Sequence, residues 1–188
     1  MHNMATAVSD SFNARRSIYA LTNESTISDD RLQELVATIV LHPPSAFNSL
    51  ASRLVVLLKH ERQKLRDIAY EVASSTVTLE LFGKLYKPRI AMFRAGYGFV
   101  FEDPTSIRPL EEKWPMLKDK FPQWSEHASG MHQYAPWTNL EAEGQGCNLQ
   151  HYNPLIDAHA QIVFGKPTGP PREKAFEPLA GRLFVQGK

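Results

Sequence analysis

The sequence is poor in cysteine, has no long hydrophobic run and carries almost no net charge. Its single cysteine, Cys147, excludes a disulfide within the chain and favours a reducing compartment. The apolar runs are too short to cross a bilayer, so we expect no membrane partner. The 21 basic and 20 acidic residues leave a formal net charge of +1, which argues against a nucleic-acid partner. We expect no secretory signal at the N-terminus, and therefore a cytoplasmic protein, with the nucleus as a second compartment.

The chain is long enough for one domain with a hydrophobic core. It has 188 residues, of which 43 % are hydrophobic, as is usual for globular proteins. No internal repeat and no linker of biased composition divides it. We therefore expect a single domain over residues 1–188.

The hydrophobic spacing changes between helical and strand-like along the chain. Ser28 is a good N-cap for a helix that must end before Pro43, because proline lacks the N–H that a helix interior needs. The apolar run RLVVLL is typical of a buried strand. The pattern is α+β, with helices expected near 29–42, 60–72, 77–93, 109–120 and 123–143, and strands near 53–58, 98–102, 147–150, 160–165 and 182–187.

A basic cluster near the N-terminus is the first candidate site. Arg15, Arg16 and Ser17 are consecutive, and two guanidinium groups with a hydroxyl suit a phosphate group. Arginine pairs are also common on solvated surfaces, where they bind nothing. From these residues alone, the solvated pair is the better interpretation.

A polar loop after the first helix is the second candidate. Residues 43–49 hold two prolines and two serines, and Asn48 can both donate and accept hydrogen bonds to the edge of a heterocycle. Helix termination followed by an ordinary turn explains the same composition. The loop alone therefore does not establish a ligand site.

The helix expected near 123–143 has few charges in its middle, so we expect it to be largely buried, with Met131 and Tyr134 inside. The third candidate is the stretch from Glu141 to Pro154, where Gly144 and Gly146 are expected to end this helix and a polar strand follows. His151 is its most reactive side chain, although a lone histidine more often has a structural role. Cys147 could be a thiol nucleophile, but no motif supports it. The sequence has no nucleophile elbow, phosphate loop or zinc-binding His-Glu-x-x-His motif, and His127 and His132 are not spaced for a helical zinc pair.

Several segments stand in a distinctive order, and PSAFNS and NLQHYNPLID are the most specific of them. The full set is RRSIYAL, HPPSAFNS before SRLVVLL, FRAGYGFVFED, FPQWSEHASGMHQYAPWTNLEAEGQGCNLQHYNPLID and FGKPTGPPREKAFEP. In this order and spacing they closely resemble the fungal branch of the nitroreductase family. The resemblance runs from about Phe12 to the C-terminus.

The resemblance implies an α+β fold with a central mixed, mainly antiparallel sheet surrounded by helices. It also implies a homodimer with FMN at the subunit interface. For the phosphate and ribityl chain of FMN, the implied residues are Arg15, Arg16 and Ser17, and the phosphate is also faced by Arg172 or Lys174, with the contacting residue of this pair left open. A loop that reaches the flavin of the other subunit would hold Pro44, Ser45, Ala46 and Asn48. The backbone beside the flavin ring would be that of Leu149, Gln150 and His151.

The implied activity is NAD(P)H oxidation with reduction of a nitroaromatic or quinone-like small molecule, in a ping-pong sequence. The flavin carries the redox chemistry, so no side chain is expected to act as acid or base. A role in the oxidative stress response goes with this activity. The alternative is a catalytically impaired protein of the same fold that acts as a regulatory or ligand-binding module in lipid signalling or the stress response.

The chain departs from the family pattern at three places. Only AHA stands between NPLID and QIVFG, where members of this branch carry a further helix's worth of residues. The strand GYGFVFED is slightly shorter than usual, and Leu50 stands where a glutamine is common. The motifs on both sides of the short segment are intact, which favours a flavin-binding protein.

Overall fold

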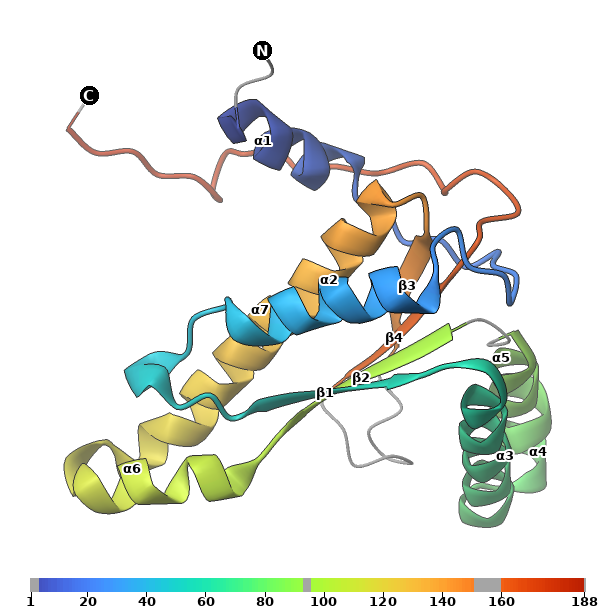
Figure 1. Ribbon diagram of the computed structural model, residues 1–188, viewed down its shortest axis with the longest axis horizontal. Coiled ribbons are helices and arrows are strands. Elements are labelled where there is room, and N and C mark those ends of the chain that lie inside the picture. The colour runs from blue at the N-terminus through green and yellow to red at the C-terminus, as the bar shows by residue number, and fades with distance from the viewer. Residues whose placement is uncertain (1–3, 93–95, 151–159, 188) are drawn as a thin grey trace.

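The computed structural model describes residues 4–92, 96–150 and 160–187, and Figure 1 shows helices arranged around a small sheet. The strands are β1 (Ser52–Leu57), β2 (Gly96–Glu102), β3 (Gly146–Gln150) and β4 (Ala160–Gly165). The longer helices are α1 (Met4–Ala14), α2 (Asp29–Leu41), α3 (Lys59–Thr76) and α7 (Phe121–Ala142). The shorter helical segments are η1 (Ala46–Asn48), α4 (Leu79–Leu81), η2 (Phe82–Tyr86), α5 (Lys87–Met92), η3 (Pro104–Ser106), α6 (Arg108–Lys113) and η4 (Pro115–Lys120).

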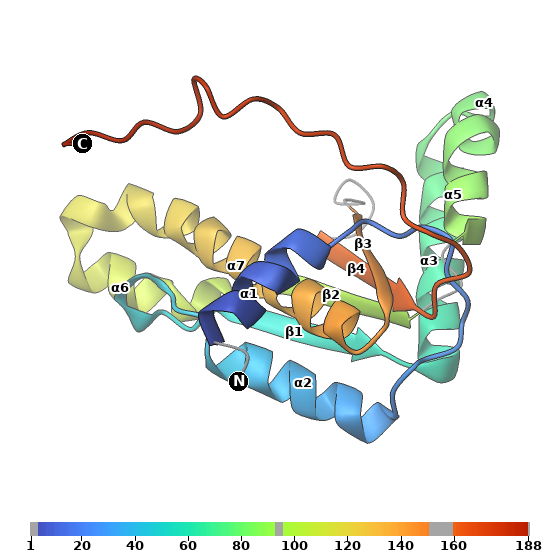
Figure 2. The ribbon, with the colours of Figure 1, turned by 90° about the horizontal axis from the view of Figure 1, so that it is seen from above.

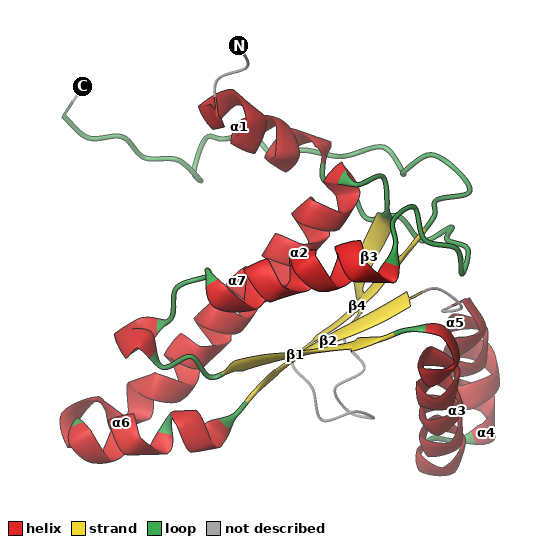
Figure 3. Ribbon diagram, in the orientation of Figure 1, coloured by secondary structure: helices red, strands yellow, loops and turns green. Residues whose placement is uncertain are grey.

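The strands lie in the order β1-β2-β4-β3, and each neighbouring pair is antiparallel (Figure 3). The register places Leu149 of β3 opposite Ile162 of β4. The short segment before β4 lies partly outside the described residues, yet β4 pairs with both β2 and β3. The expected α+β class, with a mainly antiparallel sheet among helices, is confirmed.

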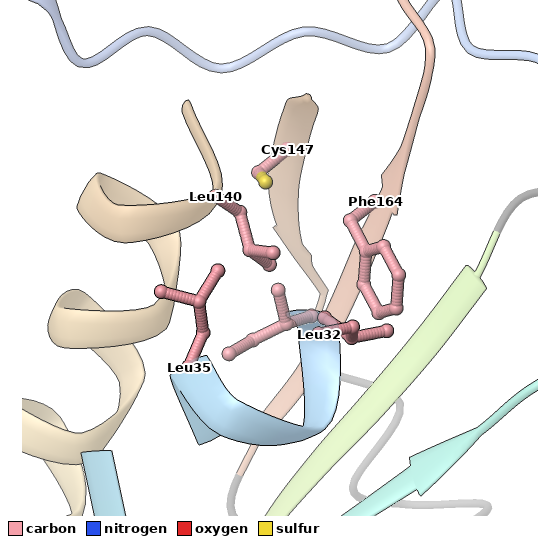
Figure 4. Close-up of a cluster of buried hydrophobic side chains, with 6 residues drawn as sticks. Leu32, Leu35, Leu140, Cys147 and Phe164 are labelled. Carbon is pink, nitrogen blue, oxygen red and sulfur yellow. The ribbon is translucent and has the colours of Figure 1, made fainter. Parts of the chain in front are cut away.

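A hydrophobic cluster joins α2 and α7 to the sheet. Figure 4 shows Leu32 and Leu35 of α2 close to Leu140 of α7, with Cys147 of β3 and Phe164 of β4 beside them. Each of these side chains is buried. Burial of one large apolar side chain contributes about 1.5–3 kcal/mol, so the cluster fixes how the two helices pack on β3 and β4.

The helix α2 begins and ends where the sequence predicts. The Ser28 hydroxyl accepts a hydrogen bond from the backbone N–H of Arg31 at 3.1 Å, which confirms the N-cap. Asp29 lies in the first turn, where the helix dipole favours negative charge. The last helical residue is Leu41, so the helix ends before Pro43 as expected.

Proline divides two of the other expected helices. The stretch near 77–93 forms α4, the π-helical segment η2 and α5, and the change to α5 falls just before Pro88. The stretch near 109–120 forms α6 and η4, which meet at Trp114. Trp114 precedes Pro115 and has non-helical backbone angles, because a following proline disfavours the helical conformation.

The long helix α7 is confirmed, but it is less buried than the sequence suggests. Its buried residues follow one face: Phe121, Ser125, Ala128, Ser129, His132, Pro136 and Leu140. Met131 and Tyr134, expected to be buried, are 39 % and 38 % exposed. The helix ends before Gly144, which has a positive φ of 78° that suits a C-terminal glycine. No helix in the described part of the chain is long and apolar enough to cross a membrane.

Two strand predictions need correction. β1 is an edge strand with Val55 40 % exposed, so its apolar run does not mark a fully buried strand. Residues 182–187 form no strand, and Phe184 is 77 % exposed. Figure 2 shows this C-terminal segment running away from the sheet, so none of the described strands lies beside it to complete a ladder.

Candidate cofactor site

The segment that follows α1 lies along the free edge of β3. The backbone N–H of Ile18 donates to the carbonyl of Cys147 at 2.8 Å, and Ser17 forms a parallel bridge with Cys147. The buried side chain of Asn148 donates to the carbonyl of Ile18, also at 2.8 Å. These bonds satisfy an edge strand that would otherwise expose its backbone groups, and they hold Arg15–Ser17 at this edge.

Gly146 makes this close approach possible. A Cβ atom at this position would lie 3.2 Å from the Cβ of buried Ile18 and 2.6 Å from a terminal methyl of Leu21. Gly146 was expected to end the preceding helix, but it is the first residue of β3. The absence of a side chain here therefore serves packing between the N-terminal segment and the sheet.

The C-terminal segment returns to the same place. The N–H of Thr168 donates to the carbonyl of Ala20 at 2.9 Å, and the N–H of Thr22 donates to the carbonyl of Lys166 at 2.9 Å. Further along, the Arg172 guanidinium lies 5.7 Å from the centre of the Tyr19 ring. The two ends of the chain thus meet beside β3.

The last turn of α7 contacts the backbone of the basic cluster through Glu141. The N–H of Arg16 donates to both carboxylate oxygens of Glu141, at 2.8 and 3.1 Å. Burial raises the pKa of Glu141, while the hydrogen bond from Arg16 and the positive charges of Arg15, Arg16 and Lys174 act in the opposite direction. Lys174 therefore lies close enough to share one electrostatic environment with the N-terminal arginines.

The predicted β3 residues lie next to this cluster. Leu149 and Gln150 are half-buried at the end of β3, and the Gln150 amide donates to the side-chain oxygen of Asn148 at 2.7 Å. Asn148 in turn holds Ile18. His151 lies outside the described residues. The structure thus brings five predicted site residues to one edge: Arg15, Arg16, Ser17, Leu149 and Gln150. Arg172 lies over Tyr19 of the same segment, and the charge of Lys174 acts on Glu141.

The predicted loop residues Pro44, Ser45, Ala46 and Asn48 are at the other end of α7. Phe47, within this loop, packs its ring 5.4 Å from Phe121 and 5.7 Å from Trp124, at the start of the helix. Figure 1 shows α6 near that end of α7 and α1 near the other. At 1.5 Å per helical residue, Trp124 lies about 20 Å along the axis from Trp137, which contacts Arg15. One subunit therefore does not bring the loop and the basic cluster together.

The loop also has an unusual backbone. Phe47, Asn48 and Leu50 have φ values of 54°, 52° and 49°, in the left-handed region that favours glycine. Such conformations cost on the order of 1–3 kcal/mol each and are concentrated at functional sites. The hydroxyl of Ser45 accepts a hydrogen bond from the N–H of Leu50 at 3.0 Å, which closes the turn.

The sequence placed Glu141 at the start of the third candidate stretch but gave it no role, and it did not identify Trp137 or Tyr19 as site residues. Trp137 and Glu141 are four residues apart, so helical spacing places them on one face. Their partner Arg16 is 125 residues from Glu141, and no local pattern predicts that contact. The sequence offered only one weak signal, a carboxylate in a helix that otherwise has few charges.

Two other reactive residues lack the environment for catalysis. Cys147 is fully buried, and burial raises the pKa of its thiol far above the ordinary value, so the reactive thiolate is not formed at neutral pH. His132 is buried, and its Nδ1 lies 2.8 Å from the carbonyl of Ala128. Within the described ranges, no group of three or more His, Cys, Asp or Glu side chains could hold a metal ion.

Comparison with known proteins relates the chain to nitroreductases. No protein-family model matches it. The chain is 37 % identical over 180 residues to HBN1 of Saccharomyces cerevisiae, described as a nitroreductase, with 87 % of this chain and 89 % of that protein covered. It is 32 % identical over 176 residues to the nitroreductase FRM2 of the same yeast, with 86 % and 89 % covered.

Solved structures agree with these relatives. The nitroreductase CinD from Lactococcus lactis, in complex with chloramphenicol, superposes with a TM-score of 0.83 at 33 % identity and covers 96 % of this chain and 100 % of its own. The same enzyme is known in complex with 4-nitrophenol, again with a TM-score of 0.83. A nitroreductase-type protein from Desulfovibrio desulfuricans, in complex with FMN, shares the fold at 18 % identity and a TM-score of 0.65, covering 96 % of this chain and 97 % of its own.

Proposed function

Because this chain belongs to the nitroreductase family, and is thus an oxidoreductase, we propose that it is an FMN-dependent enzyme that uses NAD(P)H to reduce nitroaromatic or quinone-like molecules. Bound FMN would supply the hydride-transfer chemistry between NAD(P)H and the acceptor. The protein's own groups bind and orient the cofactor. NAD(P)H and acceptor use one site in turn, so the kinetics are expected to be ping-pong.

One observation carries this proposal. Arg15–Ser17 is held at the free edge of β3 by the Ser17–Cys147 bridge and by the bond from the Arg16 N–H to Glu141, and the positive charges of Arg15, Arg16 and Lys174 act on that one carboxylate. Three cations against one carboxylate leave an excess of positive charge, and guanidinium groups match phosphate oxygens in charge and geometry. These groups fit the phosphate end of FMN, with Arg172 close by and Leu149 and Gln150 toward the ring.

The acceptor class is proposed from the relatives. CinD, 33 % identical, is described in complexes with chloramphenicol and with 4-nitrophenol, both nitroaromatic compounds. The flavin would carry the redox chemistry, so no side chain is expected to act as acid or base. Acceptor binding would then depend on flat apolar surfaces that exclude water, such as the rings of Phe47 and Trp124 contributed by the other subunit.

We further propose that the enzyme is a homodimer in which each flavin site is shared. The loop of Pro44, Ser45, Ala46 and Asn48 lies too far from the basic cluster of its own subunit, so it would serve the other subunit's site. Two-fold symmetric dimers are the commonest oligomers. Apolar side chains that a monomer leaves exposed support this assembly: Val8 and Phe12 of α1, Met131 and Tyr134 of α7, and Phe176, Leu179, Leu183, Phe184 and Val185 of the C-terminal segment.

We also propose that residues 1–188 form one domain that acts in the cytoplasm, with the nucleus as a second compartment, in the oxidative stress response. The segment after α1 bonds both to β3, through Ile18 and Cys147, and to residues 166–168 after β4, which supports a single folding unit. A fluorescent fusion tests the compartment. Growth of a deletion strain in oxidants tests the physiological role.

The visible absorbance spectrum of the purified protein tests the proposed function. We expect two flavin bands that bleach when NADH or NADPH is added without oxygen and return when a nitroaromatic follows. A protein that stays colourless with added FMN would contradict the proposal. It would favour the alternative, a regulatory or ligand-binding protein of the same fold.

A further inference from the structure

The end of α7 holds the backbone of Arg16 at both of its polar groups. The N–H of Arg16 donates to both carboxylate oxygens of Glu141, at 2.8 and 3.1 Å. The indole N–H of Trp137 donates to the carbonyl of Arg16 at 3.1 Å. Trp137 and Glu141 are one helical turn apart, so one rigid element fixes the peptide groups on both sides of Arg16.

Trp137 also contacts the side chain of Arg15. The Arg15 guanidinium carbon lies 4.5 Å from the centre of the indole ring, within the range of a cation–π interaction. The same residue therefore binds the backbone of one arginine and orients the side chain of the other. We call Trp137 and Glu141 together the α7 clamp.

The Glu141 carboxylate lies in a half-buried place among positive charges. Glu141 is half-buried, and burial of a charged carboxylate is unfavourable unless it is paired and hydrogen-bonded. Its bonded partner is the backbone N–H of Arg16, and the positive charges of Arg15, Arg16 and Lys174 act on it. Glu141 and Asp10 of α1 line one pocket, so three cations and two carboxylates leave a charge of about +1, the sign that a phosphate monoester requires.

We propose that Glu141 and Trp137 are positioning residues for the phosphate end of the cofactor site. They do not touch the phosphate themselves. They act through Arg16 and Arg15, by fixing the segment in the one arrangement that directs both arginines to the same oxygens. This inference rests on the proposed FMN site, and it adds the element that preorganises that site.

The test compares the affinities for FMN and riboflavin, which differ only in the phosphate. Flavin fluorescence titrations would be made on the full chain and on Glu141→Gln, Glu141→Ala and Trp137→Phe. Glu143→Gln is the matched control, because Glu143 lies two residues further on and pairs with Arg31 at 2.6 Å instead. Circular dichroism checks that each variant keeps its fold.

We expect Glu141→Ala to weaken FMN binding by about tenfold or more, because it removes a hydrogen bond to a charged group. Glutamine keeps one acceptor oxygen, so Glu141→Gln should stay within about threefold of the unmodified chain. Both variants remove the charge, so their difference isolates positioning from electrostatics. Riboflavin affinity should change less than about threefold in every variant, and Glu143→Gln should change neither affinity.

Trp137→Phe tests the clamp from its other side. It removes the N–H donor while keeping an aromatic ring below Arg15, and we expect FMN binding to fall about three- to tenfold. In the double variant with Glu141→Ala the losses should be less than additive, since both residues act on Arg16.

Several results would overturn the inference. One such result is equal FMN affinity for Glu141→Gln and Glu141→Ala. Another is a loss of riboflavin affinity as large as the loss of FMN affinity. A third is strict additivity of the losses in binding free energy caused by Glu141→Ala and Trp137→Phe. If the unmodified chain binds FMN and Glu141→Ala binds it equally well, the clamp is wrong and the flavin site stands. If the unmodified chain binds neither flavin, the proposed function fails and the clamp fails with it.

Discussion

The two halves of the proposed site lie at opposite ends of α7, and they differ in how far contacts within the chain hold them in place. At the C-terminal end, the basic cluster is held by bonds within the chain, including those from Arg16 to Glu141 and from Ile18 to Cys147. At the N-terminal end, the loop around Asn48 has strained backbone angles and presents a half-exposed Phe47 ring. The comparison shows that the contacts of the basic cluster form within a single subunit, whereas the loop around Asn48 leaves an apolar ring exposed, as an interface with a second subunit would require.

Deletion of residues 176–188 should have the largest effect, because it is expected to change both the dimer Kd and the affinity for FMN. The deletion removes Phe176, Leu179, Leu183, Phe184 and Val185 but keeps Arg172 and Lys174. If this apolar segment covers a second subunit, its loss should raise the dimer Kd at least about a hundredfold and lower FMN affinity with it. Sedimentation analysis measures the first effect and flavin fluorescence the second. Deletion of Gly187 and Lys188 alone is the control, and an unchanged dimer in the longer deletion would contradict the proposed interface.

Arg15→Ala should come next and should act on the half that is complete within one subunit. Loss of a charge-assisted hydrogen bond to phosphate should weaken FMN binding by roughly ten- to a hundredfold without changing the dimer Kd. Isothermal titration measures the affinity. Arg89→Ala, an exposed arginine on α5, should bind FMN normally. Unchanged affinity in Arg15→Ala would remove this residue from the site.

Gly146→Ala should destabilise the fold where the basic cluster rests on β3. The added methyl would meet Ile18 at 3.1–3.2 Å, and such overpacking costs about 1–3 kcal/mol in the free energy of unfolding. The matched variant is Gly130→Ala on α7, where nothing lies within 4 Å of the added atom. That variant should gain about 0.5–1 kcal/mol, as expected for a helix interior. Urea denaturation compares the two, and equal effects would show that Gly146 is not needed for close packing.

Ser28→Ala should have the smallest effect and should leave both halves of the site intact. Loss of the N-cap bond to Arg31 costs about 1 kcal/mol of stability. Ser28→Asp should restore most of that stability, because aspartate also caps helices well. Thermal unfolding measures both variants. A fall in FMN affinity in Ser28→Ala would show that α2 influences the site more than the structure indicates.

Local chemistry explains which parts of the fold could be predicted. The N-cap at Ser28 and the stop before Pro43 each depend on neighbouring residues, and both were confirmed. The break at Trp114 is equally local, because Pro115 follows it, but the sequence pattern predicted one helix near 109–120 there. The status of β1 as an edge strand depends on the strand order, which its own sequence does not contain. The irregular segment at 182–187 has an apolar strand-like composition but lies beside none of the described strands.

The site shows the same division. The chemistry of Arg15 and Arg16 suggested a phosphate, but the residues alone favoured a solvated pair. The Glu141 carboxylate fixes the backbone of Arg16 through a hydrogen bond between residues 125 positions apart. The charge of Lys174, from the C-terminal segment, acts on the same carboxylate. Neither contact has a local signal, so the assembled cluster becomes visible only in the folded chain.

Subunit complementation tests most directly whether one flavin site is built from two chains. Arg15→Ala impairs the basic cluster, and Asn48→Gly removes the loop amide while keeping its left-handed backbone angle. Each variant alone should bind little FMN at a concentration that saturates the unmodified protein. After the two are mixed and allowed to exchange subunits, heterodimers with one intact site should restore roughly a quarter of normal binding. No recovery after confirmed exchange would contradict the shared site.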